Sequence, residues 1–405
     1  KGESIHKNKI QSDRQKALKI YAAVDDKLPN SEKGKVLLQE AYLYSLTSNE
    51  NKSISIYQDI IKKRKYHRPD IVALAYVQLG DIYFYRGEFK KALYNFDESL
   101  KIDKNPRKAY SYYRSAWSDF NLGDSQKAQR KLIKLLSDDS FSGSKVPTSA
   151  SFKDDASRDL ATFMAKNGIK TSDLQLLANL SPEGSKRKNL VYLASELDRT
   201  GKKQSALIVW KKLGTKDLSF EDQLEGQIKI TRIQYDLGNK KNLIKELNTS
   251  ISMLKNSPCP DNTECAIGQQ NLKKILADWG KSEEREPSTE LIFAFKVFSE
   301  SFSDYEMSFW AAQASMKRKD YQQAFEGFRN AALILSKLNP TKDPKKDKIF
   351  NNSLLNAIES AERSNSKELK LVSYKLYLDL NPTGKNFYLV KYQMAHWYYD
   401  YNKYP

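Results

Sequence analysis

Apolar side chains recur along this chain at spacings of three and four residues, which is the period of an amphipathic α-helix. In the clearest example Tyr76, Leu79 and Tyr83 share one helical face. A second face of the same kind begins at Phe89, and Gly87 lies between the two, where a turn is required. The pattern predicts a helix, a turn and a second helix.

A longer pattern organises these helix pairs into repeats: a small residue, a second small residue twelve positions later, and a large residue four further on. The clearest copy is Gly80, Ala92 and Phe96. Two small residues let the helices of a hairpin approach where they cross, and the large residue fills the space between neighbouring hairpins. The pattern therefore predicts an all-α array of hairpins. The other copies are Ala41, Ser53 and Tyr57; Ala116, Ala128 and Leu132; Ala194, Ala206 and Trp210; Thr231, Leu243 and Leu247; and Ala312, Ala324 and Phe328.

Residues 73–106 resemble a tetratricopeptide repeat, a motif of about 34 residues with a fixed order of bulky, small and aromatic positions. Residues 187–213 are similar, and the other copies match less well. The resemblance implies a right-handed superhelix, or α-solenoid, of helix-turn-helix repeats that acts as a scaffold for other proteins. The residues that carry it are Tyr76, Leu79, Gly80, Tyr83, Gly87, Phe89, Ala92, Phe96 and Pro106, the proline standing two positions late.

The repeat register predicts five segments. We assign tetratricopeptide repeats to residues 1–137, 187–256 and 304–405, a linker with a degenerate helical repeat to 138–186, and a Cys-containing loop with a degenerate helical repeat to 257–303. The last repeat is expected to be incomplete, because its second helix is missing after a first helix that ends near Tyr404. An uncovered repeat exposes apolar surface, so we expect a continuing chain or another molecule to cover this end.

The composition fits an elongated array better than a compact globule. Charged residues make up 29% of the chain, and its mean hydropathy is −0.69. No run of about 18 apolar residues that could span a bilayer occurs. The net charge is +18, of which +11 falls in residues 1–137, so an anionic partner would be attracted mainly to that third. Nucleic acid is a disfavoured alternative partner, because most aromatic residues occupy packing positions of the repeat.

The sequence contains no arrangement of residues that predicts catalysis, a cofactor or a metal ion. Its three histidines, His6, His67 and His396, are scattered and have no nucleophile or carboxylate set around them. Glu-Ser pairs at Glu300 and Glu359 are the one feature shared with lytic transglycosylases, but both pairs lie in segments that predict packing helices. We therefore expect a protein that is not an enzyme.

The two cysteines, Cys259 and Cys265, lie six residues apart in a segment rich in turn formers. They can reach disulfide distance in such a turn, and the alternative is two unpaired thiols in a cytoplasmic loop. A disulfide would indicate an extracytoplasmic protein, which we expect to belong to an envelope assembly in the bacterial periplasm; the alternative is a cytoplasmic adaptor. Lys1 is not an initiator Met, which suggests a removed leader or an internal start.

In the tetratricopeptide family the first helix of each unit lines a groove that binds a protein or peptide. Carried onto this chain, that face is unusually aromatic and contains a single arginine, which suits an apolar segment with one carboxylate. The alternative is that neighbouring hairpins bury Tyr113 and Phe120 between them. Only Arg114 matches the carboxylate-gripping positions of the chaperone-type members, so that role is disfavoured. The predicted groove residues are Phe84, Tyr85, Tyr110, Tyr113, Arg114, Trp117 and Phe120.

Overall fold

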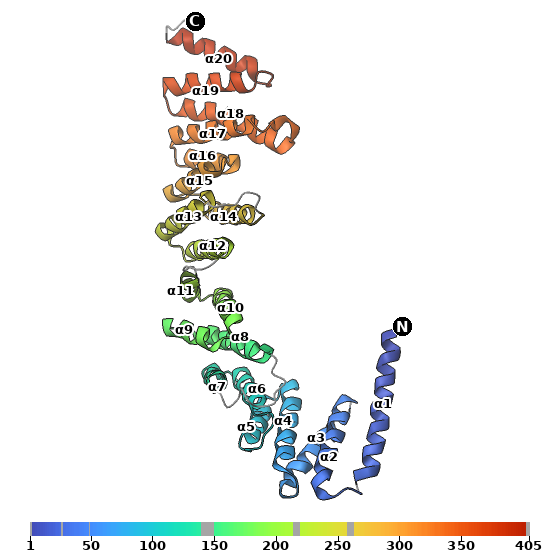
Figure 1. The fold of residues 1–405 in the computed structure, drawn as a ribbon. Coiled ribbons are helices and arrows are strands. Elements are labelled where there is room, and N and C mark those ends of the chain that lie inside the picture. The colour runs from blue at the N-terminus through green and yellow to red at the C-terminus, as the bar shows by residue number, and fades with distance from the viewer. Residues whose placement is uncertain are drawn as a thin grey trace. The chain divides into compact units, whose positions relative to one another are not determined.

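A computed structural model describes residues 2–25, 27–47, 49–138, 150–213, 219–256 and 263–401. These residues form twenty α-helices, joined by turns and short 3₁₀ segments (Figure 1). The predicted all-α repeat fold is confirmed. The chain divides into two compact units, Lys1–Val209 and Trp210–Pro405. The five predicted repeat segments are a finer division and stay a prediction.

In the first unit, the helices from α1 to α10 that follow one another in the sequence pack as neighbours, and several next-but-one helices also touch. Two short 3₁₀ helices, Arg64–Tyr66 and Glu183–Ser185, interrupt the connections. The α-helices are α1 (Gly2–Asp25), α2 (Asn30–Leu46), α3 (Glu50–Lys62), α4 (Pro69–Tyr85), α5 (Phe89–Leu100), α6 (Lys108–Asn121), α7 (Ser125–Ser137), α8 (Ala150–Asn167), α9 (Thr171–Leu180), α10 (Lys186–Arg199) and α11 (Lys203–Leu213), the last of which runs across the boundary between the units.

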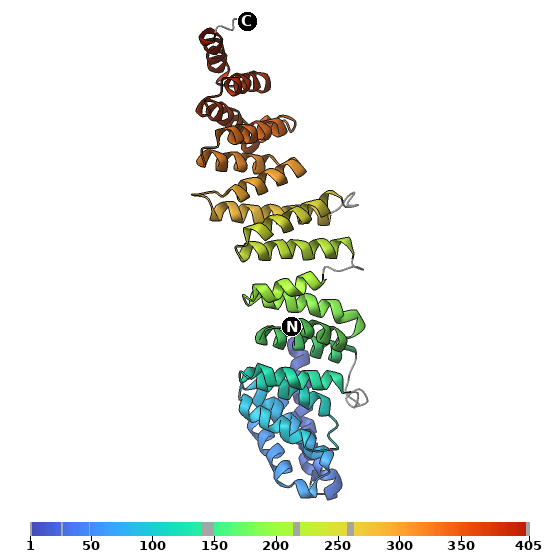
Figure 2. The same ribbon diagram turned by 90° about the vertical axis from the view of Figure 1, so that its left-hand side faces the viewer.

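In the second unit the helices from α12 to α20 succeed one another along one direction, as the yellow to red ribbons of Figures 1 and 2 show. A 3₁₀ helix, Pro340–Lys342, precedes α18. The α-helices are α12 (Phe220–Asp236), α13 (Lys240–Lys255), α14 (Thr263–Ser282), α15 (Thr289–Phe302), α16 (Tyr305–Lys317), α17 (Tyr321–Ser336), α18 (Pro344–Arg363), α19 (Lys367–Leu380) and α20 (Phe387–Asp400). Among the described helices of both units, none combines the length and apolar character needed to cross a membrane.

The triplets that define the repeat lie in the core, as their spacing predicts. In the copy Gly80, Ala92 and Phe96, the last two side chains are fully buried. A Cβ atom on Gly80 would lie 2.8 Å from the Phe96 ring, so the glycine is needed for this close approach. Each of the other five triplets is at most 3% exposed at every position. The predicted register is therefore confirmed by burial.

Most hairpin turns have the same backbone geometry at the end of the first helix. A residue with positive φ follows the first helix, and the next residue donates its backbone N–H to the carbonyl five positions earlier, as in Asp124 to Asp119 (3.0 Å) and Asp320 to Ser315 (3.0 Å). The side chains of Asp124 and Asp320 then cap the following helix. At most of these turns the positive-φ residue is glycine, but in the α16–α17 turn it is Lys319, with φ 63°.

Because an L-residue with a side chain is strained in this region, Lys319→Gly is expected to raise the free energy of unfolding by up to about 1 kcal/mol. Urea denaturation of the full chain measures the change. Lys319→Ala is the matched control, since alanine keeps the Cβ atom and should leave the stability nearly unchanged. A gain of the same size in both variants would show that the lysine charge, and not the backbone, is responsible.

The structure does not test the predicted disulfide between Cys259 and Cys265. Cys259 lies outside the described residues, as does Tyr404 at the end of the chain. Cys265 is at the start of α14, partly buried against the core that α12 to α16 share. The pairing of the two cysteines stays a prediction.

Candidate partner-binding surfaces

Four of the predicted groove residues gather around a carboxylate between α4 and α6. The Tyr110 hydroxyl donates to Asp81 Oδ1 at 2.9 Å, and Arg114 Nε donates to the same oxygen at 3.0 Å. The guanidinium carbon of Arg114 also lies 3.9 Å from the centre of the Phe84 ring and 5.1 Å from that of Tyr85. The seven predicted groove residues form an aromatic strip along the first helices of neighbouring hairpins. Asp81 organises the part of this strip that α4 and α6 build together.

This cluster is mostly closed to a partner. The side chains of Arg114 and Asp81 are 11% and 15% exposed, and burial raises the pKa of the Asp81 carboxyl above its ordinary value while Arg114 opposes that rise. Arg114 Nη2 is buried and has no hydrogen-bond partner among the described residues. Tyr85 is 80% exposed, so it is the member of the cluster that a partner can reach directly.

The other three predicted residues, Tyr113, Trp117 and Phe120, lie against α8. The hydroxyl of Tyr113 and Nε1 of Trp117 both donate to Asp159 Oδ2, at 2.5 Å and 2.8 Å. The rings of Phe120 and Phe163 stack with 4.5 Å between their centres. Burial raises the pKa of the Asp159 carboxyl. These contacts favour the alternative in which a neighbouring hairpin covers this half of the strip, and a role in partner binding stays a prediction.

Sequence reasoning missed Asp159 and Phe163, which both lie in the segment that was expected to be a linker and a degenerate repeat. Their spacing of four residues on one helix face was the available signal. This spacing indicates a packing face only once α8 is known to contact α6.

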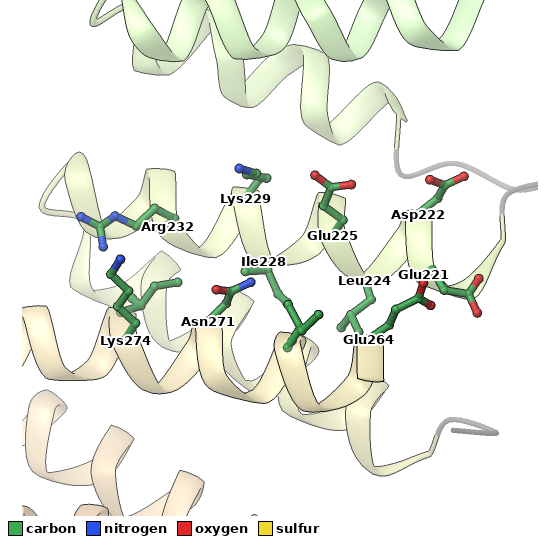
Figure 3. A pocket seen from close by; sticks show the side chains of 13 residues that line it. Glu221, Asp222, Leu224, Glu225, Ile228, Lys229, Arg232, Glu264, Asn271 and Lys274 are labelled. Carbon is green, nitrogen blue, oxygen red and sulfur yellow. The ribbon is translucent and has the colours of Figure 1, made fainter. Parts of the chain in front are cut away.

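A groove of about 620 Å³ runs between α12 and α14 in the second unit, and sequence reasoning did not find it (Figure 3). Its floor is apolar and formed by Leu224, Ile228 and Ile275, which are buried. Ile267, half exposed, extends this floor along α14. Gly268 permits the close approach of the two helices, because a Cβ atom there would lie 3.0 Å from Leu224 Cδ2.

Charged side chains of opposite sign line the two ends of the groove, as Figure 3 shows. Glu221 and Asp222 lie in the first turn of α12 and Glu264 in the first turn of α14, where the helix dipole favours negative charge, and the basic residues lie farther along both helices. The acidic end consists of Glu221, Asp222, Glu225 and Glu264, and the basic end of Lys229, Arg232 and Lys274.

Arg232 is held within the protein. Its Nε lies 3.1 Å from Asp236 Oδ1, and its Nη1 pairs with Asp278. Lys229 and Lys274 are exposed, and neither forms an ion pair with another described residue. The two lysines are therefore the charges of the basic end that a ligand can engage.

Residues 73–106 match the tetratricopeptide repeat family, which confirms the resemblance predicted from the same residues. The chain thus contains a tetratricopeptide repeat at residues 73–106. No curated protein matches the chain.

Several solved structures are similar at low identity. The Cut9–Hcn1 heterotetramer of APC/C has 13% identity and a TM-score of 0.33, with 98% of this chain and 89% of that chain covered. The TPR domain of P58(IPK) has 12% identity and a TM-score of 0.27, with 92% and 99% covered. Yeast Tom70 has 13% identity and a TM-score of 0.26, with 92% and 89% covered.

Proposed function

We propose that this protein is a non-enzymatic scaffold that binds a segment of another protein in the groove between α12 and α14. The observation that carries the proposal is a groove of about 620 Å³ with a buried apolar floor and charged walls. Apolar floors supply affinity, and polar rims supply orientation and specificity. The exposed ring of Tyr85 in the first unit supports a second contact, with Phe84 and Arg114 stacked behind it.

We also propose that the protein works outside the cytoplasm, in a bacterial envelope assembly. The two cysteines in one turn-rich segment support this compartment. Two free thiols in mass spectra of non-reduced material would favour the alternative of a cytoplasmic adaptor.

Site-specific photo-crosslinking in cells tests whether the groove between α12 and α14 binds another protein. A photoreactive amino acid at Asn271, an exposed residue on the groove wall, is expected to trap a discrete protein adduct. The matched control is Thr249, which is exposed on α13, the second helix of the same hairpin as α12, and should give no such adduct. Equal labelling at both positions, or none at Asn271, would contradict binding in this groove.

A further inference from the structure

We propose that the groove between α12 and α14 selects its partner by the order of charges along it. The preferred segment has basic residues at one end, apolar residues in the middle and acidic residues at the other end. This inference rests on the scaffold function proposed above and adds the chemistry of the partner.

The length of the segment follows from the length of the groove. Glu221 and Arg232, the first and last residues of α12 that line it, are eleven residues apart. A helix rises about 1.5 Å per residue, so the two ends of the groove are roughly 16 Å apart. An extended chain advances about 3.3 Å per residue, so about five to six residues of a partner match this span.

The middle of the segment must be apolar. The floor offers Leu224 and Ile228 from α12 and Ile267 and Ile275 from α14, and of these Ile228 and Ile267 lie between the acidic and the basic residues of their helices. Ile267 is 49% exposed, so its side chain is the part of this apolar floor that is most open to solvent. A charged residue placed above it would lose hydration without gaining a polar contact.

The ends require opposite charges. At the acidic end Glu221 and Glu225 are exposed and form no ion pair within the described part of the chain. At the basic end Lys229 and Lys274 are also exposed and form no ion pair with another described residue. Arg232, in contrast, is paired with Asp236 and Asp278. A partner of one charge sign would be attracted at one end and repelled at the other. A segment with separated charges is attracted at both, so charge order decides specificity.

The direct test measures the binding of labelled synthetic peptides to the full chain by fluorescence polarisation at low salt. The peptide Lys-Lys-Leu-Leu-Glu-Glu has separated charges, and Lys-Glu-Leu-Leu-Lys-Glu has the same composition with interleaved charges. We expect the first to bind roughly tenfold more tightly, since each exposed ion pair adds a few-fold. Equal affinity of the two peptides would overturn the proposal.

Charge reversal of the groove provides the internal control. The variant E221K/E225K replaces two exposed charges of the acidic end by basic ones, while Asp222 and Glu264 remain. The preference for separated charges should be lost, and Glu-Glu-Leu-Leu-Glu-Glu should bind this variant more tightly than it binds the unmodified chain. Adding K229E/K274E reverses the exposed charges of the other end as well, and because an extended peptide can bind in the opposite direction, the preference for separated charges should return. All four residues are exposed, so the variants should fold.

A second control separates local charge from net charge. E183K/E359K changes the net charge by the same amount as E221K/E225K but lies outside the groove, and it should keep the preference of the unmodified chain. Failure of the fourfold variant to recover the preference would overturn the proposal. If Asn271 crosslinks a protein but peptides show no dependence on charge order, the scaffold function stands and the charge-order rule falls. If charge order matters but Asn271 traps no protein, the scaffold function falls.

Discussion

Replacing Arg114 by Met is expected to lower the free energy of unfolding by about 3 to 5 kcal/mol, because Asp81 is left as a buried charge without its partner. The two side chains are 11% and 15% exposed, and Arg114 Nε lies 3.0 Å from Asp81 Oδ1. Methionine keeps much of the contact with Phe84, so the loss reports mainly on the charge. Urea denaturation of the full chain measures it.

The loss should depend on pH in a defined direction. In the unmodified chain, burial already raises the pKa of Asp81 above its ordinary value of 3.8, and loss of Arg114 removes an interaction that lowers it. When the folded-state pKa exceeds the unfolded one, the folded state binds more protons between the two values, so stability falls as the pH rises through that window. The deficit of the Arg114→Met variant should therefore be smallest near pH 3.8 and largest at neutral pH.

The double variant Asp81→Asn, Arg114→Met is the control for this dependence. Asparagine removes the titrating group, so the deficit of the double variant should be nearly independent of pH. If the single and double variants lose the same stability at every pH, the ion pair is not the cause of the deficit.

Replacing Phe163 by Ala is expected to cost about 3 to 5 kcal/mol of unfolding free energy, the usual range for deleting a buried aromatic ring. The ring is fully buried, stacks on Phe120 with 4.5 Å between ring centres and makes a T-shaped contact with Trp117 at 5.1 Å. Thermal unfolding and urea denaturation both measure the change.

Tyr85→Ala is the matched control, since its ring belongs to the predicted strip but is 80% exposed, and its loss should change stability by less than about 0.5 kcal/mol. A small effect of Phe163→Ala would mean that α8 does not hold this half of the strip. Trp117 and its neighbours would then be available to a partner, as the sequence alone predicts.

The repeat could be predicted from the sequence because the small residues have a local steric reason. Helices can cross closely only where side chains are small, so Gly80 and Ala92 leave a signal at a fixed spacing, and Phe96 fills the gap that they create. The same reasoning identified all six triplets. The residues of the hairpin turns are likewise chosen by local backbone geometry, although Ser303 and Lys319 occupy positions of positive φ where glycine would be expected.

The candidate surfaces were harder to predict, because they depend on contacts between helices of different hairpins. Tyr113 and Trp117 look like an open aromatic face until Asp159 and Phe163 of α8 are placed against them. The charged stripe of α12 resembles the solvated face of any amphipathic helix. The separation of acidic and basic residues along α12 can be recognised as part of a groove only when α14 is placed beside it, with Glu264 near the acidic residues and Lys274 near the basic ones.

The neighbour-to-neighbour packing described for each unit has a kinetic consequence. Among the helices that the structure describes, extensive contacts join only those that are adjacent or next but one in the sequence. Each contact therefore closes a short stretch of chain, which costs little loop entropy and favours rapid folding. Hairpins of this kind can nucleate at several points and grow in either direction, so during synthesis the early repeats need not wait for the later ones.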